Sequence, residues 1–366
     1  MGIEITPYSE THVQAVQAFN RRLALANGYA EYRFPERPAA AGDGRRLAET
    51  YFLALSEGVV HGGYILNRQE FLFHGEPRRV AHYRLPLSEG VLDRAYAGVG
   101  VQMLRSALRT EPLLFALGMG GADRSLPRML RAMGWRLTPV PFYFRVLNAG
   151  RLLRELPLAG ASRARRLGAV LARWSGAAGL GFSAAQAVRK RACRGAAAEP
   201  EREFADWSDA LWQRCHGRYR MIAARDSRAL NALYPAADER FHRLRVMRDG
   251  SPAGWALVLD TAMSGDRHFG GLRVGSIADC LALPEDAGAV IAAAAAWLER
   301  RGVDLIVSNQ SHAAWRAALE RAGFLRGPSN FIFAASKELA RLLEPFDSAQ
   351  DEIHINRGDG DGPIHL

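Results

Sequence analysis

Residues 82–108 bring together the side chains and backbone features that could do chemistry in this chain. Gly98 and Gly100 come directly before a stretch in which apolar residues recur at helical spacing, so a helix should begin at these glycines. The free amides at a helix start, together with the helix dipole, favour a phosphate group, and glycine lets that group approach the backbone closely. The sequence therefore predicts a pyrophosphate site on the backbone of Ala97, Gly98, Val99, Gly100 and Val101.

The segment just before these glycines alternates like a β-strand. Tyr83, Leu85 and Leu87 fall on one face and His82 on the other. Pro86 has no amide hydrogen to donate to a neighbouring strand, so the strand should separate from its neighbour there. Backbone amides of Leu85 and Leu87 at such a break could stabilise a carbonyl oxygen that gains negative charge during a reaction. A separated strand beside a phosphate-binding helix start is therefore the expected site.

The elements expected up to residue 146 follow a recognisable order. Strands are expected at residues 3–5, 59–73, 79–87, 113–117 and 141–146, and helices at residues 10–26, 47–56, 98–108 and 125–133. This order and the glycine pair resemble the GNAT superfamily of acyl-CoA N-acyltransferases. The resemblance implies an α/β fold with a mixed sheet and acetyl-CoA or another acyl-CoA as co-substrate. It also implies a separated strand that accepts the pantetheine arm and a glycine turn that holds the CoA pyrophosphate.

Two positions depart from the pattern of that superfamily. Its glycine turn reads Arg/Gln-x-x-Gly-x-Gly/Ala, whereas this chain has Ala95 in the first position and Arg94 one residue out of register. Many members also place a tyrosine four residues before the Gly-Phe that ends the next helix, and counting back from Gly134 gives Leu130. A proton donor for the leaving thiolate must therefore come from elsewhere, or this half of the chain does no chemistry.

Three side chains could move protons in such a reaction, which needs a neutral amine and a polarised thioester carbonyl. His82 is the first candidate for the general base because it lies on the strand just before the break, and Glu89 is the second. Tyr143 could donate a proton to the thiolate. Each also has a structural alternative: His82 as a core or rim residue, Glu89 as a solvent-facing carboxylate, and Tyr143 as a packing residue of an aromatic strand.

Length and composition are those of an ordinary globular protein. With 366 residues, of which 48% are hydrophobic and 23% charged, the chain is long enough for two domains with large cores. No apolar run reaches the roughly 18 residues of a membrane span, and the first residues lack the basic and apolar segments of a signal peptide. Cys193, Cys215 and Cys280 are widely spaced, which favours a reducing cytoplasm over disulfides or a zinc site. We therefore expect a cytoplasmic, bacterial protein without a metal.

The net charge of +10 is concentrated in one segment. Residues 151–195 contain ten basic residues against one acid, Glu155, so the two flanking parts together carry a net charge of only +1. A combined charge this small argues against a nucleic-acid-binding face on either of them. Residues 163–174 carry an apolar stripe, which indicates a helix that bridges two domains. The alternative is an interfacial helix with weak affinity for an anionic membrane surface.

From residue 204 the order of expected elements repeats that of the first half and again ends in a helix followed by Gly323-Phe324. This half therefore resembles a second GNAT-like domain. Its glycine turn is missing, because Glu285 and Asp286 stand where amides should bind phosphate, and two carboxylates repel a pyrophosphate. Acyl-CoA is therefore expected in the first domain, and the second should bind the acceptor or serve as structure.

The last residues, 346–366, are rich in Asp and Gly. Repeated Asp-Gly pairs favour turns, and the closing Glu of a twelve-residue calcium loop is absent. A flexible tail is the expectation. The alternative is a tail that folds back over a cleft and presents Asp359 or Asp361 to a cationic acceptor.

Together these inferences predict two tandem GNAT-like domains: residues 1–150 with the acyl-CoA site, a basic and partly helical linker over 151–203, a second domain over 204–345, and the tail at 346–366. The predicted activity is transfer of an acyl group, above all acetyl, from acyl-CoA to a small-molecule amine. An amino sugar or another precursor of a polysaccharide or cell envelope would be such an acceptor. Two alternatives stay open: a FemABX-like aminoacyl transferase that uses aminoacyl-tRNA, and a non-catalytic scaffold that binds CoA or a partner.

Overall fold

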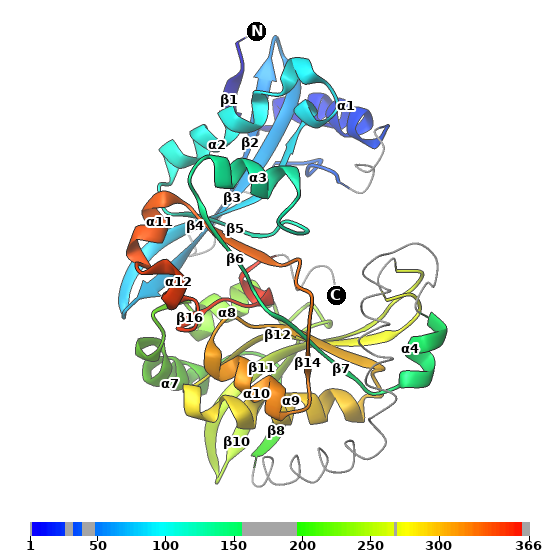
Figure 1. The fold of residues 1–366 in the computed structure, drawn as a ribbon, viewed down its shortest axis with the longest axis vertical. Coiled ribbons are helices and arrows are strands. Elements are labelled where there is room, and N and C mark those ends of the chain that lie inside the picture. Colours follow the sequence, from blue (N-terminus) through cyan, green and yellow to red (C-terminus); the bar gives the residue numbers. More distant parts are fainter. Residues whose placement is uncertain (1, 26–31, 39–47, 156–195, 267–268, 361–366) are drawn as a thin grey trace. The chain divides into compact units, whose positions relative to one another are not determined.

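The computed structural model describes residues 2–25, 32–38, 48–155, 196–266 and 269–360 (Figure 1). The chain divides into two compact units, and each unit takes segments from both halves of the sequence. The first unit contains Met1–Phe71, Pro77–Thr138 and Ile332–Phe346. The second contains Leu72–Glu76, Pro139–Phe331 and Asp347–Leu366.

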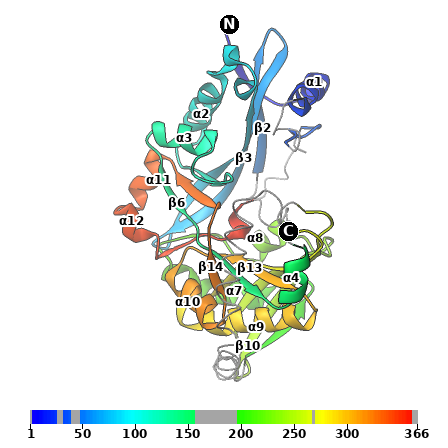
Figure 2. The ribbon, with the colours of Figure 1, turned by 45° about the vertical axis from the view of Figure 1, so that its right-hand side comes forward.

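A mixed sheet forms the centre of the first unit. Its strands lie in the order β1 (Glu4–Pro7), β2 (Ala48–Ser56), β3 (Val59–Phe73), β4 (Glu76–Ser88), β5 (Leu114–Gly118), β15 (Ile332–Ala335) and β6 (Arg136–Pro139). The first three strands pair antiparallel, β4 and β5 pair parallel, and β15 is antiparallel to β5. One face of the sheet is covered by α1 (Val13–Ala24), and the other by α2 (Val99–Thr110) and α3 (Ser125–Ala132) (Figure 2).

The alternation of side chains along β2 and β3 explains this packing on both faces. Leu53 and Ile65 share an apolar cluster with Phe19 of α1, whereas their neighbours Ala54 and Tyr64 belong to the cluster that contains α2. Successive residues of a strand point to opposite faces, so a sheet covered on both sides must be apolar at consecutive positions. The stretches of β2 and β3 that are covered on both faces, residues 51–55 and 64–66, are therefore apolar at every position.

Residues 48–56 form a strand, and the helix predicted over residues 47–56 was wrong. Alanine and leucine in this segment favour a helix when they are considered alone, but that preference is weak. Neighbouring strands override it, because Leu53 pairs with Thr6 of β1 on one side and with Gly63 of β3 on the other. The other elements predicted in this half form at or near the expected positions.

The second unit is built on another mixed sheet. Its strands lie in the order β14 (Leu325–Gly327), β7 (Phe142–Val146), β13 (Leu305–Asn309), β12 (Arg273–Ala282), β11 (Ser251–Ala262), β10 (His242–Arg248) and β8 (Ala196–Glu201). The described helices of this unit include α4 (Ala149–Glu155), α7 (Asp206–Cys215), α8 (Ser227–Leu233), α9 (Ala287–Arg300) and α10 (Ala313–Arg321). The hairpin between β10 and β11 turns at Asp249 and Gly250, which have φ values of 50° and 78°, as this pair of residues predicts.

Each of the two sheets contains strands from both halves of the sequence. β7 follows the elements of the first half, yet it lies between β13 and β14 of the second sheet. β15 comes from the second half and pairs with β5 of the first sheet. The compact units therefore do not follow chain order, and the domain limits at residues 150, 203 and 345 stay a prediction.

The C-terminal segment is folded up to residue 360, so the expectation of a flexible tail was wrong for those residues. After α11 (Lys337–Leu342) and α12 (Phe346–Ala349), β16 (Ile353–His354) pairs parallel with β9 (Met221–Ala223). Asp359 is 5% exposed and forms an ion pair with Arg225, which the sequence alone could not reveal. Asp361 lies outside the described residues.

The basic linker falls largely outside the described residues, because residues 156–195 are not among them. This gap includes the predicted bridging helix and its proposed membrane contact. Among the residues that the structure describes, no helix is both long enough and apolar enough to cross a membrane.

Candidate active site

A left-handed residue interrupts β4 close to the predicted break. Leu85 has a φ of 46°, a conformation that costs a non-glycine residue roughly 1–2 kcal/mol. As a result, the side chains before and after Leu85 point to opposite faces of the sheet. Tyr83 packs in the cluster that contains α2, whereas Leu87 packs in the cluster that contains α1. In a regular strand two residues four apart share a face. The predicted shared face of Tyr83, Leu85 and Leu87 was therefore wrong, and the break lies at Leu85, one residue before Pro86.

A second irregularity lies beside the first, on β3. Consecutive residues of β2 pair with Val60 and Gly62, so His61 between them is the extra residue of a β-bulge. Gly62 lies directly against the end of β4, since a Cβ there would come within 2.9 Å of the Leu87 carbonyl oxygen. The bulge thus places His61 beside the residues that follow the break in β4.

His61 belongs to a buried cluster of charged and aromatic side chains. Its Nδ1 lies 2.6 Å from Oε2 of Glu89, in the short 3-10 turn that follows β4. Arg22 of α1 donates to the other carboxylate oxygen of Glu89 and to the carbonyl oxygen of Val60. The imidazole stacks on the ring of Tyr96, with centroids 4.0 Å apart and an interplanar angle of 18°. His61 and Glu89 are only 6% and 5% exposed, so Glu89 does not face solvent.

The start of α2 is open, as a phosphate site requires. Gly98 is the N-cap residue, and no described side chain caps this end of the helix. A Cβ at Gly98 would meet no atom nearer than 3.9 Å, and one at Gly100 no atom nearer than 3.7 Å. The turn before the helix is held by Asp93, which accepts a hydrogen bond from the amide of Ala95 at 2.8 Å. The amides of the first helical turn therefore fit a pyrophosphate group.

Solved structures resemble this chain over most of its length, although no protein-family model and no curated protein sequence matches it. A GCN5-related N-acetyltransferase from Anabaena variabilis has a TM-score of 0.54 at 11% identity, covering 94% of this chain and 75% of that one. A conserved protein of unknown function from Enterococcus faecalis has a TM-score of 0.51 at 11% identity, with coverage of 94% and 75%. A tandem GNAT protein from the clavulanic acid biosynthesis pathway has a TM-score of 0.48 at 13% identity, covering 91% and 98%.

This chain has a GNAT fold. That finding confirms the predicted fold class and the resemblance on which it was based. Similarity at this level of identity establishes the GNAT fold, whereas a reaction has to be argued from the site itself. In the first unit, the left-handed Leu85, Glu89 and the open start of α2 lie on one short stretch of backbone, and His61 of β3 contacts Glu89.

The other predicted proton-transfer residues have different surroundings. His82 is 4% exposed, and its ring stacks on Phe115 of β5, with centroids 4.7 Å apart and an interplanar angle of 8°. Tyr143 lies in β7 of the second unit and donates a hydrogen bond to Glu320 at 3.0 Å. Burial and this hydrogen bond raise the pKa of Tyr143 to about 12. Leu130, at the position where many GNAT proteins have tyrosine, is fully buried in the cluster that contains α2.

His61 was not among the residues predicted for the site, although the sequence contains a signal of the bulge that positions it. Glycine inside a strand pattern often marks a bulge or a close approach of backbone, and Gly62 and Gly63 directly follow His61. In the structure both explanations hold, because His61 is bulged and Gly63 leaves room for the ring of Phe34.

The equivalent helix start in the second unit carries carboxylates. A 3-10 turn at Pro284–Asp286 precedes α9 and contains Glu285 and Asp286, the two carboxylates noted in the sequence. Asp286 forms an ion pair with Arg248 at 2.6 Å, and Glu285 forms one with Arg218 at 3.3 Å. Arginine side chains of the protein itself thus pair with the negative charge at this helix start.

The place where the strands of the second unit separate is filled by the C-terminal segment. Parallel pairing of β12 and β13 ends at Ile277 and Ser308. Beyond that point Asn356 forms a β-bridge with Gln310, and its side-chain amide donates to Asp279 at 2.8 Å. Asn356 is fully buried. The chain therefore occupies the split of its own second sheet.

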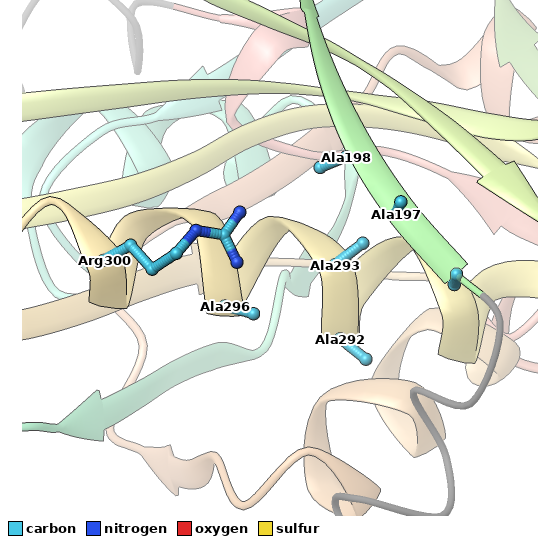
Figure 3. A pocket seen from close by; sticks show the side chains of 7 residues that line it. Ala197, Ala198, Ala292, Ala293, Ala296 and Arg300 are labelled. Atoms are coloured by element: carbon cyan, nitrogen blue, oxygen red, sulfur yellow. The ribbon is translucent and has the colours of Figure 1, made fainter.

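One pocket of the second unit lies between β8 and α9 and has a volume of about 190 Å³ (Figure 3). Its lining is Ala196, Ala197, Ala198, Ala292, Ala293, Ala296 and Arg300. Methyl groups and a single guanidinium offer no arrangement of groups for catalysis. Within the described residues, no three His, Cys, Asp or Glu side chains gather as a metal site requires.

Proposed function

We propose that this chain is an acyl-CoA N-acyltransferase with one acyl-CoA site, formed by the first unit. The observation that supports it most strongly is the left-handed Leu85 in β4, on the same stretch of chain as the uncapped start of α2. Amides at the irregular strand could bind the thioester carbonyl oxygen as it gains charge, and the amides of residues 98–101 could hold the pyrophosphate. The amide of Ala97 is not available, because it donates to the carbonyl oxygen of Arg94 at 3.1 Å. The residues that we propose for both tasks belong to one unit.

The second unit supports the proposal of a single site. Its helix start carries Glu285 and Asp286, and its strand split is filled by the C-terminal segment. A pyrophosphate would meet repulsion at the first place, and a pantetheine arm would meet side chains at the second. We therefore propose a structural or acceptor-binding role for this unit. By analogy with two-domain proteins of this fold, the proposal extends to acetyl as the acyl group and an amino sugar or cell-envelope precursor as the acceptor.

Acetyl-CoA titration by calorimetry tests the proposal. Gly98→Glu and Gly100→Glu should each weaken binding by at least about tenfold, because a carboxylate at the helix start takes the place of the phosphates and repels them. A glutamate in the first helical turn favours the helix, so folding should be retained. Gly217→Glu in the second unit is the matched control, since a side chain there meets open space.

Absence of acetyl-CoA binding at millimolar concentration would refute the proposed function. Binding without release of the CoA thiol, across a broad panel of amines, would favour a non-catalytic CoA-binding scaffold. The replacement of the usual tyrosine by the buried Leu130 is the observation that favours this second function.

A further inference from the structure

We propose that His61 is the catalytic base of the acyl transfer and that Glu89 is the residue that positions its ring. This inference rests on the acyl-CoA site proposed above. His61 is assigned from three observations: a bulge that sets it out of the regular pairing of β3, a buried carboxylate that holds one ring nitrogen, and a position between the two halves of the proposed site.

The position of His61 is fixed from both sides of the proposed site. On one side the next residue, Gly62, lies against the carbonyl of Leu87, two residues after the left-handed Leu85. On the other side the imidazole stacks on Tyr96, two residues before the helix N-cap at Gly98. The ring therefore bridges the strand that would bind the thioester and the turn that would bind the pyrophosphate.

Glu89 determines which nitrogen of His61 is free to react. With Oε2 of Glu89 at 2.6 Å, a proton on Nδ1 is held by the carboxylate, so the neutral ring carries its lone pair on Nε2. No described residue forms a hydrogen bond with Nε2. Arg22 of α1 pairs with the same carboxylate from a partly exposed position, so Glu89 is not an isolated buried anion. Around the ring, the titratable groups in contact are Glu89 and Tyr96, with Arg22 behind the carboxylate.

The step balances without another reactant. The lone pair of the amine attacks the thioester carbonyl carbon, the C–N bond forms, and the C–S bond breaks with its electron pair remaining on sulfur. The amine nitrogen loses one proton to Nε2 of His61, directly or through one water molecule. The resulting imidazolium, stabilised by Glu89, returns this proton to the CoA thiolate, directly or through solvent. The products are the amide and neutral CoA thiol.

The test combines binding, turnover and the state of the histidine ring. Wild type and His61→Gln should bind acetyl-CoA with affinities within about threefold of each other, because His61 contributes to chemistry rather than to phosphate binding. Thiol release from acetyl-CoA with hydroxylamine as the amine probe should fall about 10²–10⁴-fold in His61→Gln, the usual contribution of a general base. His74→Asn is the matched control, because His74 is exposed and asparagine tolerates its φ of 49°.

Long-range ¹H–¹⁵N spectra of the histidine rings give a readout that packing alone would not produce. The signal that disappears in His61→Gln should report a proton on Nδ1 and none on Nε2 at neutral pH, and it should shift when acetyl-CoA is added. In Glu89→Gln this tautomer preference should be lost and turnover should fall, while acetyl-CoA affinity stays unchanged.

Two results would overturn the role of His61: turnover in His61→Gln within threefold of wild type, or a wild-type ring that carries its proton on Nε2. A failure of the proposed function looks different. In that case acetyl-CoA does not bind to wild type at all, and the tautomer still decides whether Glu89 positions the ring.

Discussion

A charged side chain is stable in a protein interior only where partners surround it, and Arg225 meets this condition. Its Nη2 donates to Asp359 at 2.6 Å, and its Nε lies 2.8 Å from Asp279. Tyr234 and Asn356 also donate to Asp279, at 2.7 and 2.8 Å. Opposite charge and hydrogen bonds together offset the desolvation of these groups. Asp359 thereby fixes the C-terminal segment, which explains why residues that resemble a flexible tail are folded.

Two buried histidines should make the second unit sensitive to acid. Burial, helped by the positive charge of Arg316, lowers the pKa of His312 to about 4. Burial also holds the pKa of His354 well below its usual value. Both rings are neutral in the folded protein and gain a proton on unfolding below about pH 6.5, so the unfolded state binds more protons there. The stability is therefore complete above about pH 6.5 and falls as the pH drops from 6.5 toward 4.

The variant His312→Asn isolates the part of this acid-dependent loss of stability that is due to His312. Asparagine can still cap α10, where Nδ1 of His312 accepts a hydrogen bond from the amide of Ala314 at 3.2 Å. Between pH 7 and pH 5, wild type should lose about 2 kcal/mol more unfolding free energy than the variant. Urea unfolding followed by tryptophan fluorescence measures both values. Equal losses in the two proteins would contradict the assignment of this acid sensitivity to His312.

At the scale of elements, the irregular strands β3 and β4 combine a bulge with a left-handed residue. Glycine in a regular strand is less stable than alanine by roughly 0.5–1 kcal/mol, because it loses more backbone freedom on folding. At a positive φ the order reverses, since only alanine is strained there. Leu85→Gly should therefore be more stable than Leu85→Ala by about 1 kcal/mol.

Leu87, two residues further along the same strand, provides the control for this comparison of glycine and alanine, because it has no positive φ. Here the glycine variant should be the less stable of the two. Thermal unfolding of the four variants measures both differences. The same order of glycine and alanine at both positions would show that the backbone at Leu85 is unstrained.

The elements around the proposed site show what a sequence can and cannot predict. Helical periodicity and the glycine pair were sufficient to predict α2 and its open start, because those signals are local. The helix predicted over residues 47–56 failed because pairing with two neighbours decided the structure of β2. His61 could not be found from its own residue type, since a bulge depends on the register of another strand. Its partner Glu89 was a candidate, but its burial and its contact with Arg22 come from packing.

At the scale of the whole molecule, the exchange of β7 and β15 ties the two units together. β15 is an inner strand of the first sheet, and its residues Phe333, Ala334 and Ala335 are fully buried. A fragment of residues 1–150 would lack this strand and expose the edge of β5, which favours aggregation. The rest of the chain would lack β7, which lies between β13 and β14.

We therefore expect that residues 1–150 expressed alone do not fold into a soluble monomer. Coexpression with residues 151–366 should restore a soluble complex, because each fragment then receives its missing strand. Circular dichroism and size-exclusion chromatography distinguish these states. A soluble monomeric fragment 1–150 with a cooperative thermal transition would show that β15 is dispensable.

The placement of β15 and of the C-terminal segment has a consequence for how the protein is made. A ribosome releases the amino-terminal half first, and in most multidomain chains that half can fold while translation continues. Here the first sheet needs residues 332–335, and the split in the second sheet is filled by residues 356–359, which are synthesised later still. Neither sheet can be completed before these residues have left the ribosome, so the segments made earlier must be kept from aggregating for longer than the two-unit architecture would suggest.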